Sequence, residues 1–101
     1  MTKIKICGVQ TIEDAQMCIN AGVDAIGFVF APSKRQISPQ RAQQLANILP
    51  PFIARVGVFV DTPRGEVNEI AKAVGLTVLQ FHGNEDADYS SGFTLPVIKA
   101  I

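Results

Sequence analysis

The chain has 101 residues, which is enough for one small domain. Apolar residues make up 48% and charged residues 18%, a composition that excludes an intrinsically disordered chain. Nine basic residues balance nine acidic ones, so net charge gives no support to binding of nucleic acid or of an anionic membrane. No apolar run approaches the roughly 18 residues of a spanning helix, and the N-terminus lacks a signal-peptide core. We therefore expect a cytoplasmic protein.

The first predicted element is a short strand at residues 3–8. Side chains alternate along an extended backbone, so Ile4 and Ile6 share one face and Lys5 and Cys7 the other. Cys7 lies at the end of this strand. Chemistry in β/α folds gathers where strands end and loops to helices begin, which makes Cys7 the first candidate for a functional residue.

Strand and helix then alternate along the chain. Thr11 and Ser38 are suited to cap the first two helices, and Asn84 a short fourth one. Asp61 ends a strand, and because Thr62 and Pro63 follow, we expect it to cap the third helix. The sequence predicts helices at 11–21, 39–49, 61–74 and 86–90, and further strands at 25–30, 55–60, 78–81 and 97–101.

Five strands and four helices without a linker indicate one α/β unit. The strand at 55–60 is apolar on both faces, as parallel strands with helical crossovers require. An edge at the fifth strand with no helix after it would leave backbone groups unpaired. The alternatives are an open flavodoxin-like sheet and the first half of a (β/α)8 barrel, which normally has about 200 residues or more.

Polar side chains recur on one face of these strands. Gln80 and His82 share one face of the fourth strand, and we place Lys99 of the fifth strand with them, as we do Lys5 and Cys7. In a barrel this face points into the interior or its mouth, where burial is costly unless the polar groups are used or paired. This pattern is a stronger functional signal than any one residue.

Each candidate residue also has a purely structural interpretation. Cys7 near a lysine can be a nucleophile or a general base, or a small buried hydrophobe. Cys18, on a helical apolar stripe, is structural; the two cysteines fit neither a zinc pattern nor a disulfide scaffold. His82 can be a site residue or a structural histidine. Lys34 and Arg35 can pair with a carboxylate or phosphate, or be solvated.

Five short blocks carry a family resemblance: Lys5-Ile6-Cys7-Gly8, Gly27-Phe28-Val29-Phe30 with Ser33-Lys34-Arg35, Val56-Gly57-Val58-Phe59-Val60, Gln80-Phe81-His82-Gly83 and Val97-Ile98-Lys99-Ala100. In order and spacing they resemble the N-terminal half of phosphoribosylanthranilate isomerase. The departure is Phe81, where the family more often has leucine. The resemblance implies that residues 1–101 are the N-terminal half of a single (β/α)8 TIM-barrel domain acting in tryptophan biosynthesis.

The resemblance also implies a reaction. It is the Amadori rearrangement of N-(5-phosphoribosyl)anthranilate to 1-(2-carboxyphenylamino)-1-deoxyribulose 5-phosphate, without metal or cofactor. By motif match Cys7 is the general base, Arg35 binds the anthranilate carboxylate, and His82 lies at the substrate site, with Lys5 and Gln80 as possible support. The aspartic acid that protonates the ribose ring oxygen and the phosphate-binding turns lie beyond the fifth strand in the family. We therefore expect this chain to be inactive alone.

Three other interpretations remain open from the sequence. The first is a non-catalytic half-barrel that pairs its open sheet edges with another copy or with a complementary half. The second is a flavodoxin-like signalling module with Asp61 as its key acid, although Cys7 and Gly8 stand where such a module carries acidic residues. The third is a different barrel enzyme for a phosphorylated sugar.

Overall fold

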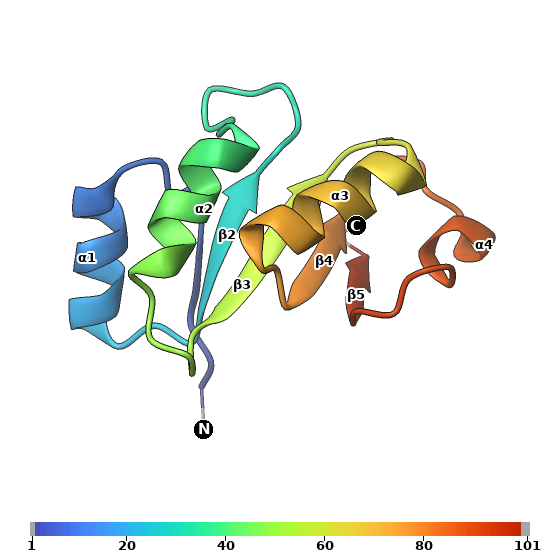
Figure 1. Ribbon diagram of the computed structural model, residues 1–101. Coiled ribbons are helices and arrows are strands. Elements are labelled where there is room, and N and C mark those ends of the chain that lie inside the picture. The colour runs from blue at the N-terminus through green and yellow to red at the C-terminus, as the bar shows by residue number, and fades with distance from the viewer. Residues whose placement is uncertain (1, 100–101) are drawn as a thin grey trace.

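The computed structural model describes residues 2–99, which alternate strand and helix along their whole length. Helices α1, α2 and α3 lie over one face of the sheet, whereas the short α4 lies beyond the β5 edge (Figure 1). The elements are β1 (Lys5–Cys7), α1 (Ile12–Ala21), β2 (Ala25–Val29), α2 (Pro39–Asn47), β3 (Ala54–Phe59), α3 (Arg64–Val74), β4 (Val78–Phe81), α4 (Ala87–Ser90) and β5 (Val97–Lys99).

The five strands form one parallel sheet in the order β1-β2-β3-β4-β5. This order decides between the two predicted architectures, because a flavodoxin-like sheet has the order 2-1-3-4-5 whereas barrel strands follow one another around the ring. Lys5 of β1 donates a hydrogen bond to Gln80 of β4, so the face opposite the helices is concave. The sheet is thus a curved arc with two open edges, β1 and β5.

The core lies between the sheet and helices α1 to α3. Strand residues Ile26, Phe28, Phe59 and Phe81 are fully buried there. The ring of Phe59 lies 5.3 Å from that of Phe30 and 6.4 Å from that of Phe81. Burying side chains of this size stabilises the fold by roughly 1.5–3 kcal/mol each, so this aromatic row contributes substantially to the core.

Two predicted helix starts are confirmed by their caps. The hydroxyl of Thr11 accepts a hydrogen bond from the backbone N–H of Asp14 at 3.0 Å, and the hydroxyl of Ser38 accepts from that of Arg41 at 3.1 Å. Each cap satisfies one backbone donor that the first turn of a helix leaves unpaired. Helix α1 ends at Gly22, whose φ of 73° is a left-handed conformation that favours glycine.

Two predicted caps are wrong. Helix α4 is capped by Asp86, whose carboxylate accepts from the N–H of Tyr89 at 2.8 Å, and not by Asn84. Helix α3 follows Pro63 without a side-chain cap, so Asp61 does not cap it. The carboxylate of Asp61 instead accepts from the backbone N–H of Asn84 at 2.7 Å. A contact between two loops thus takes the place of the cap expected from Asp61, and the cap of α4 lies two residues later than expected.

The predicted face of Lys99 is also wrong. In the register of β4 and β5, Gln80 pairs with Ile98 and Phe81 pairs with Lys99. Lys99 therefore shares the helix-side face with Phe81, because Val97 packs against the core and sets the alternation of the strand. Residues 100 and 101 of the predicted strand lie outside the described residues.

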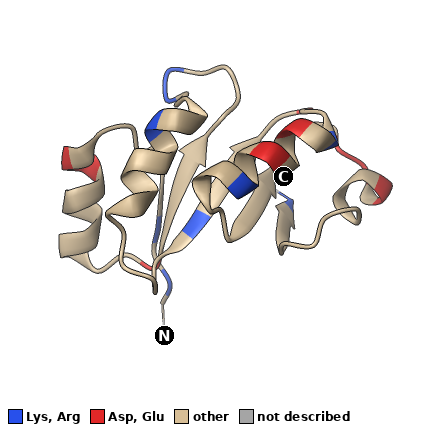
Figure 2. Ribbon diagram, in the orientation of Figure 1, with Lys and Arg blue, Asp and Glu red and all other residues tan. Residues whose placement is uncertain are grey.

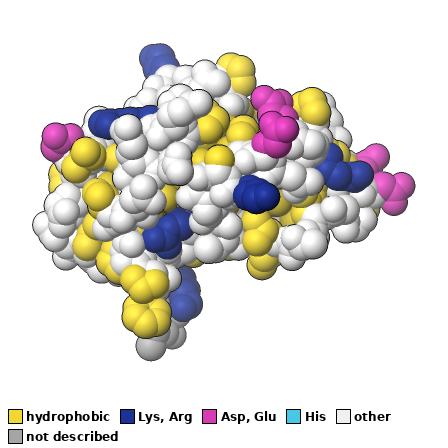
Figure 3. Space-filling model, in the orientation of Figure 1, with side chains coloured by type: hydrophobic (Ala, Val, Ile, Leu, Met, Phe, Trp, Pro, Cys, Tyr) yellow, Lys and Arg dark blue, Asp and Glu magenta, His cyan; other side chains and the backbone are white. Residues whose placement is uncertain are grey.

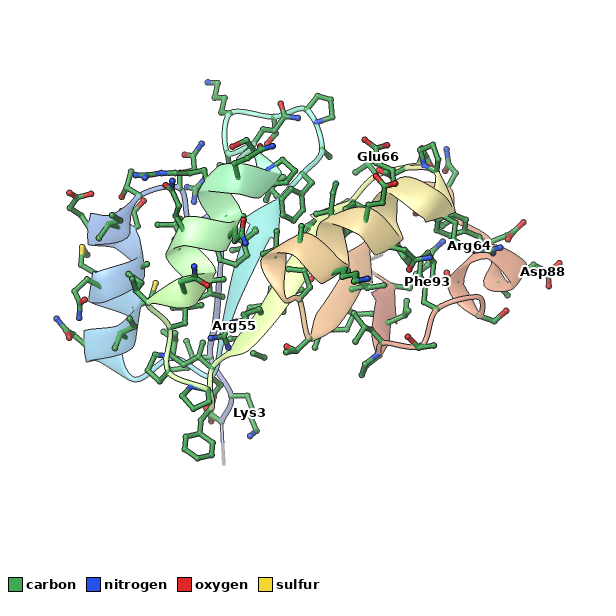
Figure 4. All side chains as sticks on the ribbon, viewed as in Figure 1. Lys3, Arg55, Arg64, Glu66, Asp88 and Phe93 are labelled. Atoms are coloured by element: carbon green, nitrogen blue, oxygen red, sulfur yellow. The ribbon has the colours of Figure 1, made fainter. Side chains whose placement is uncertain are left out.

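Charged residues of both signs are spread over the ribbon (Figure 2), as the balanced composition predicts. Arg55 has a structural role: its guanidinium donates to the backbone carbonyls of Ala46, Leu49 and Ile53 at 2.8–3.2 Å, and it points toward the end of α2 (Figure 4). It thereby satisfies acceptors at and just beyond the C-terminus of α2. Within residues 2–99, no helix is long and apolar enough to cross a membrane.

Candidate active site

Cys7 is an exposed, unpaired thiol at the end of β1. The residue beside it in the sheet is Gly27 of β2. A Cβ placed on Gly27 would lie 3.0 Å from the sulfur of Cys7, closer than an ordinary van der Waals contact. The absence of a side chain at Gly27 therefore leaves room for the thiol on the concave face.

Arg35 reaches Cys7 from the loop that follows β2. Its Nη1 donates a hydrogen bond to the carbonyl oxygen of Cys7 at 3.3 Å. The side chain crosses over Gly8, where an added Cβ would overlap its Cδ, and Gly8 has a φ of 85° that favours glycine. Glycine at this position thus permits a cationic side chain to lie directly against the strand end that carries the thiol.

The loop of Arg35 is held by a residue that the sequence did not reveal. Gln10, in the loop after β1, donates from its side-chain amide to the carbonyls of Lys34 and Gln36, both at 3.2 Å. Within the loop, the hydroxyl of Ser33 accepts from the backbone N–H of Arg35 at 3.1 Å. A glutamine in a loop carries no motif, so only the fold could show this link between the two loops.

A groove of about 640 Å³ opens next to Cys7 and Arg35. Its apolar wall includes Ile4, Ile6 and Met17, which are 48%, 41% and 69% exposed. Ile4 and Ile6 are on the helix side of the sheet as predicted, but β1 is an edge strand, so they are only partly covered. Apolar side chains also show at the α1 end of the face drawn in Figure 3.

Lys5 and Gln80, predicted as supporting residues, meet across the concave face. The ammonium of Lys5 donates to the side-chain oxygen of Gln80. These two polar groups come from β1 and β4, so their contact pairs two groups that a closed barrel would bury. Their bond lies on the same face as Cys7.

His82 directly follows β4, two residues after Gln80. It is exposed, its backbone N–H donates to the carbonyl of Phe59 at 3.0 Å, and its side chain does not line the groove beside Cys7 and Arg35. Among residues 2–99 the structure therefore joins Arg35 to the backbone of Cys7 and Lys5 to Gln80, and exposes His82 at the end of β4.

Carboxylates join the ends of β3 and β4. Glu85 is only 6% exposed, and its two oxygens accept from the backbone N–H groups of Asp61 at 2.6 Å and Gly83 at 2.8 Å. Burial alone would raise the pKa of Glu85, but these N–H groups, its own N–H and the charge of Lys99 outweigh burial and lower that pKa. Glu85 was not among the predicted site residues, and its only signal in the sequence is an acid three residues after His82.

The start of α3 is tied to the α4 segment by an aromatic and cationic cluster. Arg64 lies 5.3 Å from the ring centre of Tyr89 and 5.7 Å from that of Phe93, and donates to the carbonyls of Asp88 and Tyr89 (Figure 4). The hydroxyl of Tyr89 donates to the carbonyl of Thr62. Burial, together with the charges of Glu85 and Asp61, raises the pKa of Tyr89 against the opposing charge of Arg64.

Cys18 matches its structural interpretation. Its side chain is buried in α1, and burial, with the charge of Asp14, raises the pKa of its thiol. Within the described part of the chain, no group of three acidic, histidine or cysteine side chains is placed to hold a metal ion.

Five parallel strands in sequential order, helices on one face and polar side chains at the strand ends define half of a (β/α)8 TIM barrel. The chain belongs to the N-(5'-phosphoribosyl)anthranilate (PRA) isomerase family, whose model matches residues 4–101. The N-(5'-phosphoribosyl)anthranilate isomerase of Desulforamulus reducens is 50% identical over all 101 residues, which make up 49% of its length.

Solved structures show the same half-length match. The phosphoribosyl anthranilate isomerase of Thermotoga maritima superposes with a TM-score of 0.97 at 42% identity, over 100% of this chain and 51% of that one. A phosphoribosyl anthranilate isomerase in complex with reduced 1-(o-carboxyphenylamino)-1-deoxyribulose 5-phosphate gives the same TM-score and identity, over 100% and 54%. The chain thus spans about half the length of the relatives that it matches.

Proposed function

We propose that this chain supplies the N-terminal half of a PRA isomerase barrel. The reaction is the Amadori rearrangement of N-(5-phosphoribosyl)anthranilate to 1-(2-carboxyphenylamino)-1-deoxyribulose 5-phosphate, a step of tryptophan biosynthesis in the cytoplasm. The observation that carries the proposal is the placement of Cys7 against Arg35 at the end of β1, in a chain of this family. A relative's complex with a reduced form of the product supports the substrate class.

The proposed role of Cys7 is that of general base. Protonation of the ribose ring oxygen opens the ring to a Schiff base, and the thiolate of Cys7 then removes the proton from ribose C2. The electron pair of that C–H bond moves toward the iminium nitrogen and forms an enolamine, which tautomerises to the ketone. Hydrogen and electrons are conserved within the substrate, so no external oxidant or reductant takes part. A positioned base of this kind contributes about 10²–10⁴-fold to the rate.

The other site residues have binding roles in this proposal. Arg35 binds the anthranilate carboxylate, because a guanidinium presents paired N–H donors that match a carboxylate. His82, exposed at the end of β4, contacts the substrate from the opposite side of the barrel mouth. Lys5 and Gln80 support the site through their bond across the concave face.

The general acid and the phosphate-binding turns are expected from the second half of the barrel. We therefore propose that residues 1–101 are half of a single domain and are inactive alone. Without an acid to open the ribose ring, no Schiff base forms and the general base has no proton to remove. The anionic phosphate of the substrate also needs hydrogen-bond donors, which we assign to the second half of the barrel.

A chimaera tests this proposal. This chain would replace the first half of the 50%-identical Desulforamulus reducens isomerase, and turnover of N-(5-phosphoribosyl)anthranilate would be measured for the chimaera and for the 101-residue chain. We expect turnover by the chimaera and none by the chain. A folded but inactive chimaera would contradict the proposed function, and turnover by the chain that Cys7→Ala abolishes would contradict its dependence on a second half.

A second candidate is a half-barrel that associates with another copy through its open edges. The partly exposed Ile4, Ile6 and Met17 beside the unpaired edge of β1 favour it. Sedimentation velocity over a hundredfold range of concentration would test it. A shift from monomer to dimer that Ile6→Lys suppresses would support self-association, and a monomer at every concentration would exclude it.

A further inference from the structure

Glu85 differs from every other charged residue in the described part of the chain, because it alone is buried. Its Oε2 accepts from the N–H of Asp61, just after β3, and its Oε1 accepts from the N–H of Gly83, just after β4. A buried carboxylate is costly unless such donors satisfy it, and here both oxygens are used. The side chain is thus a bridge between the ends of two neighbouring strands.

Asp61 completes the bridge from the other side. Its Oδ1 accepts from the N–H of Asn84 at 2.7 Å, so each loop places one carboxylate on the backbone of the other. Asp61 has a φ of 48°, a left-handed conformation that few residues other than glycine adopt. A Cβ on Gly83 would lie 2.7 Å from Oδ1 of Asp61, so the two loops meet without space for a side chain. We call these two reciprocal contacts the Asp61–Glu85 clip.

We propose that Glu85 is a positioning residue that holds the turn after His82, and thereby fixes the direction in which His82 projects from β4. Gly83, whose N–H is bound by Glu85, directly follows His82. On the other side, the N–H of His82 is bound by the carbonyl of Phe59 of β3. The backbone of His82 is therefore anchored to β3 directly and through the clip. This proposal rests on the substrate-binding role proposed for His82.

The bridge requires a carboxylate of this length. Two N–H donors face two oxygens, and a glutamine can accept only one of them, because its amide NH₂ would face the other donor. Aspartate keeps the charge but is one methylene shorter, so it cannot span both loops from the same backbone position. Glu85→Gln therefore breaks one half of the bridge with almost no change in volume.

A double-mutant cycle in the chimaera tests the proposal. Kinetics are measured for Glu85→Gln, His82→Ala, the double variant and the control Glu69→Gln, an exposed acid of α3. We expect Glu85→Gln to lower kcat/KM by up to about a hundredfold, mainly through KM, when His82 is present. In the His82→Ala background the same change should have less than about a twofold effect, because residues that act as a unit are not additive.

Each outcome has a distinct meaning. An equal effect of Glu85→Gln in both backgrounds, or no effect in either, overturns the positioning role. An inactive parent chimaera refutes the proposed function instead. If Glu85→Gln does not fold, amide hydrogen exchange of the unmutated 101-residue chain decides: protected Asp61 and Gly83 amides support the clip, and exchange at solvent rates overturns it.

Discussion

The loops after β1 and β2 (the β1–β2 end) and the loops after β3 and β4 (the β3–β4 end) differ in how their polar groups are satisfied. At the β1–β2 end, the exposed thiol of Cys7 lies over Gly27, and the exposed guanidinium of Arg35 crosses Gly8 to the backbone carbonyl of Cys7, beside an apolar groove. At the β3–β4 end, carboxylates, backbone amides and aromatic rings close the loops on one another. At the first end the thiol and the guanidinium are exposed to solvent, whereas at the second end the carboxylates are hydrogen-bonded to backbone N–H groups of the protein.

This difference separates the residues proposed for chemistry from those that fix geometry. Cys7 and Arg35 have few protein partners, so they are available to a substrate or to the second half of a barrel. Glu85 and Tyr89 have partners on both loops and are buried or half-buried. Substitutions at the first end should therefore change activity with little effect on stability. Substitutions at the second end should lower stability, and they should change activity only where they move His82, as Glu85→Gln is expected to do.

The largest expected effect is the loss of activity in Cys7→Ala. In the chimaera we expect turnover to fall by about 10²–10⁴-fold, the usual contribution of a positioned general base. The thermal midpoint should stay within a few degrees, because Cys7 is exposed at an edge strand. Steady-state kinetics and a thermal melt measure the two effects. A large fall in the midpoint would show that Cys7 is a packing residue and would contradict the difference between the two ends.

Stability should depend most on the aromatic core at the other end. Phe81 is fully buried and its ring lies 5.1–6.4 Å from those of Phe59, Tyr89 and Phe93. Phe81→Ala should lower the free energy of unfolding by about 3–5 kcal/mol. The matched substitution Ile6→Ala, at an exposed edge, should cost less than about 2 kcal/mol. Urea unfolding of the 101-residue chain measures both, and similar costs would contradict the difference between the ends.

Most of the fold followed from local signals in the sequence. Hydroxyl caps at Thr11 and Ser38 and the left-handed Gly22 act within a few residues, so the starts of α1 and α2 and the end of α1 could be predicted. The pairing of Cys7 with Arg35 was available only through the family resemblance, because 28 residues separate them. Which residues would meet across the sheet depends on register, which alternation within one strand does not determine.

The errors and omissions have the same origin. Asp61 was expected to cap the next helix, but its carboxylate binds the backbone of Asn84, 23 residues away. The bridge from Glu85 to Asp61 spans 24 residues and no motif marks it. Lys99 was placed on the wrong face because the packing of Val97 against the core sets the parity of β5. Local sequence propensity does not predict contacts between residues this far apart in the chain.

The clip should make the stability of the chain depend on pH. The pKa of Glu85 is lowered in the folded state, so its carboxylate stabilises the fold at pH values above its unfolded pKa of 4.5, and this contribution is lost as pH falls through the folded pKa. Glu85→Gln removes it. At pH 7 the variant should be less stable by about 1.5–3 kcal/mol, the usual value of hydrogen bonds to a charged group.

Urea unfolding of both proteins between pH 3 and pH 7 measures this dependence. Because the variant retains every other titratable group, the difference between the two proteins reports the carboxylate of Glu85 together with its interactions with Lys99 and Tyr89. The difference should be greatest above pH 4.5 and shrink below it. A difference that is constant over this range would mean that Glu85 contributes by packing rather than by charge.

The smallest expected effect on stability concerns one aspartate at each end. The carboxylate of Asp24 accepts from the backbone N–H of Ile4 at 2.8 Å, and that of Asp61 accepts from the backbone N–H of Asn84 at 2.7 Å. Of the two, only Asp61 has a left-handed backbone conformation. Asp61→Ala loses the acceptor and also opposes that backbone conformation, so we expect a cost of about 1–2 kcal/mol. Asp24→Ala, at the open β1 edge, should cost about 0.5–1 kcal/mol.

Asp61→Asn separates the two causes, because asparagine retains an acceptor oxygen and tolerates the left-handed region. It should stay within about 0.5 kcal/mol of the parent chain in urea unfolding, since its side chain can still accept from the N–H of Asn84. If Asp61→Asn instead costs as much as Asp61→Ala, the negative charge of Asp61 is what holds the loop. The β3–β4 end would then be fixed by electrostatics at both carboxylates, and backbone conformation would contribute little to the difference between the ends.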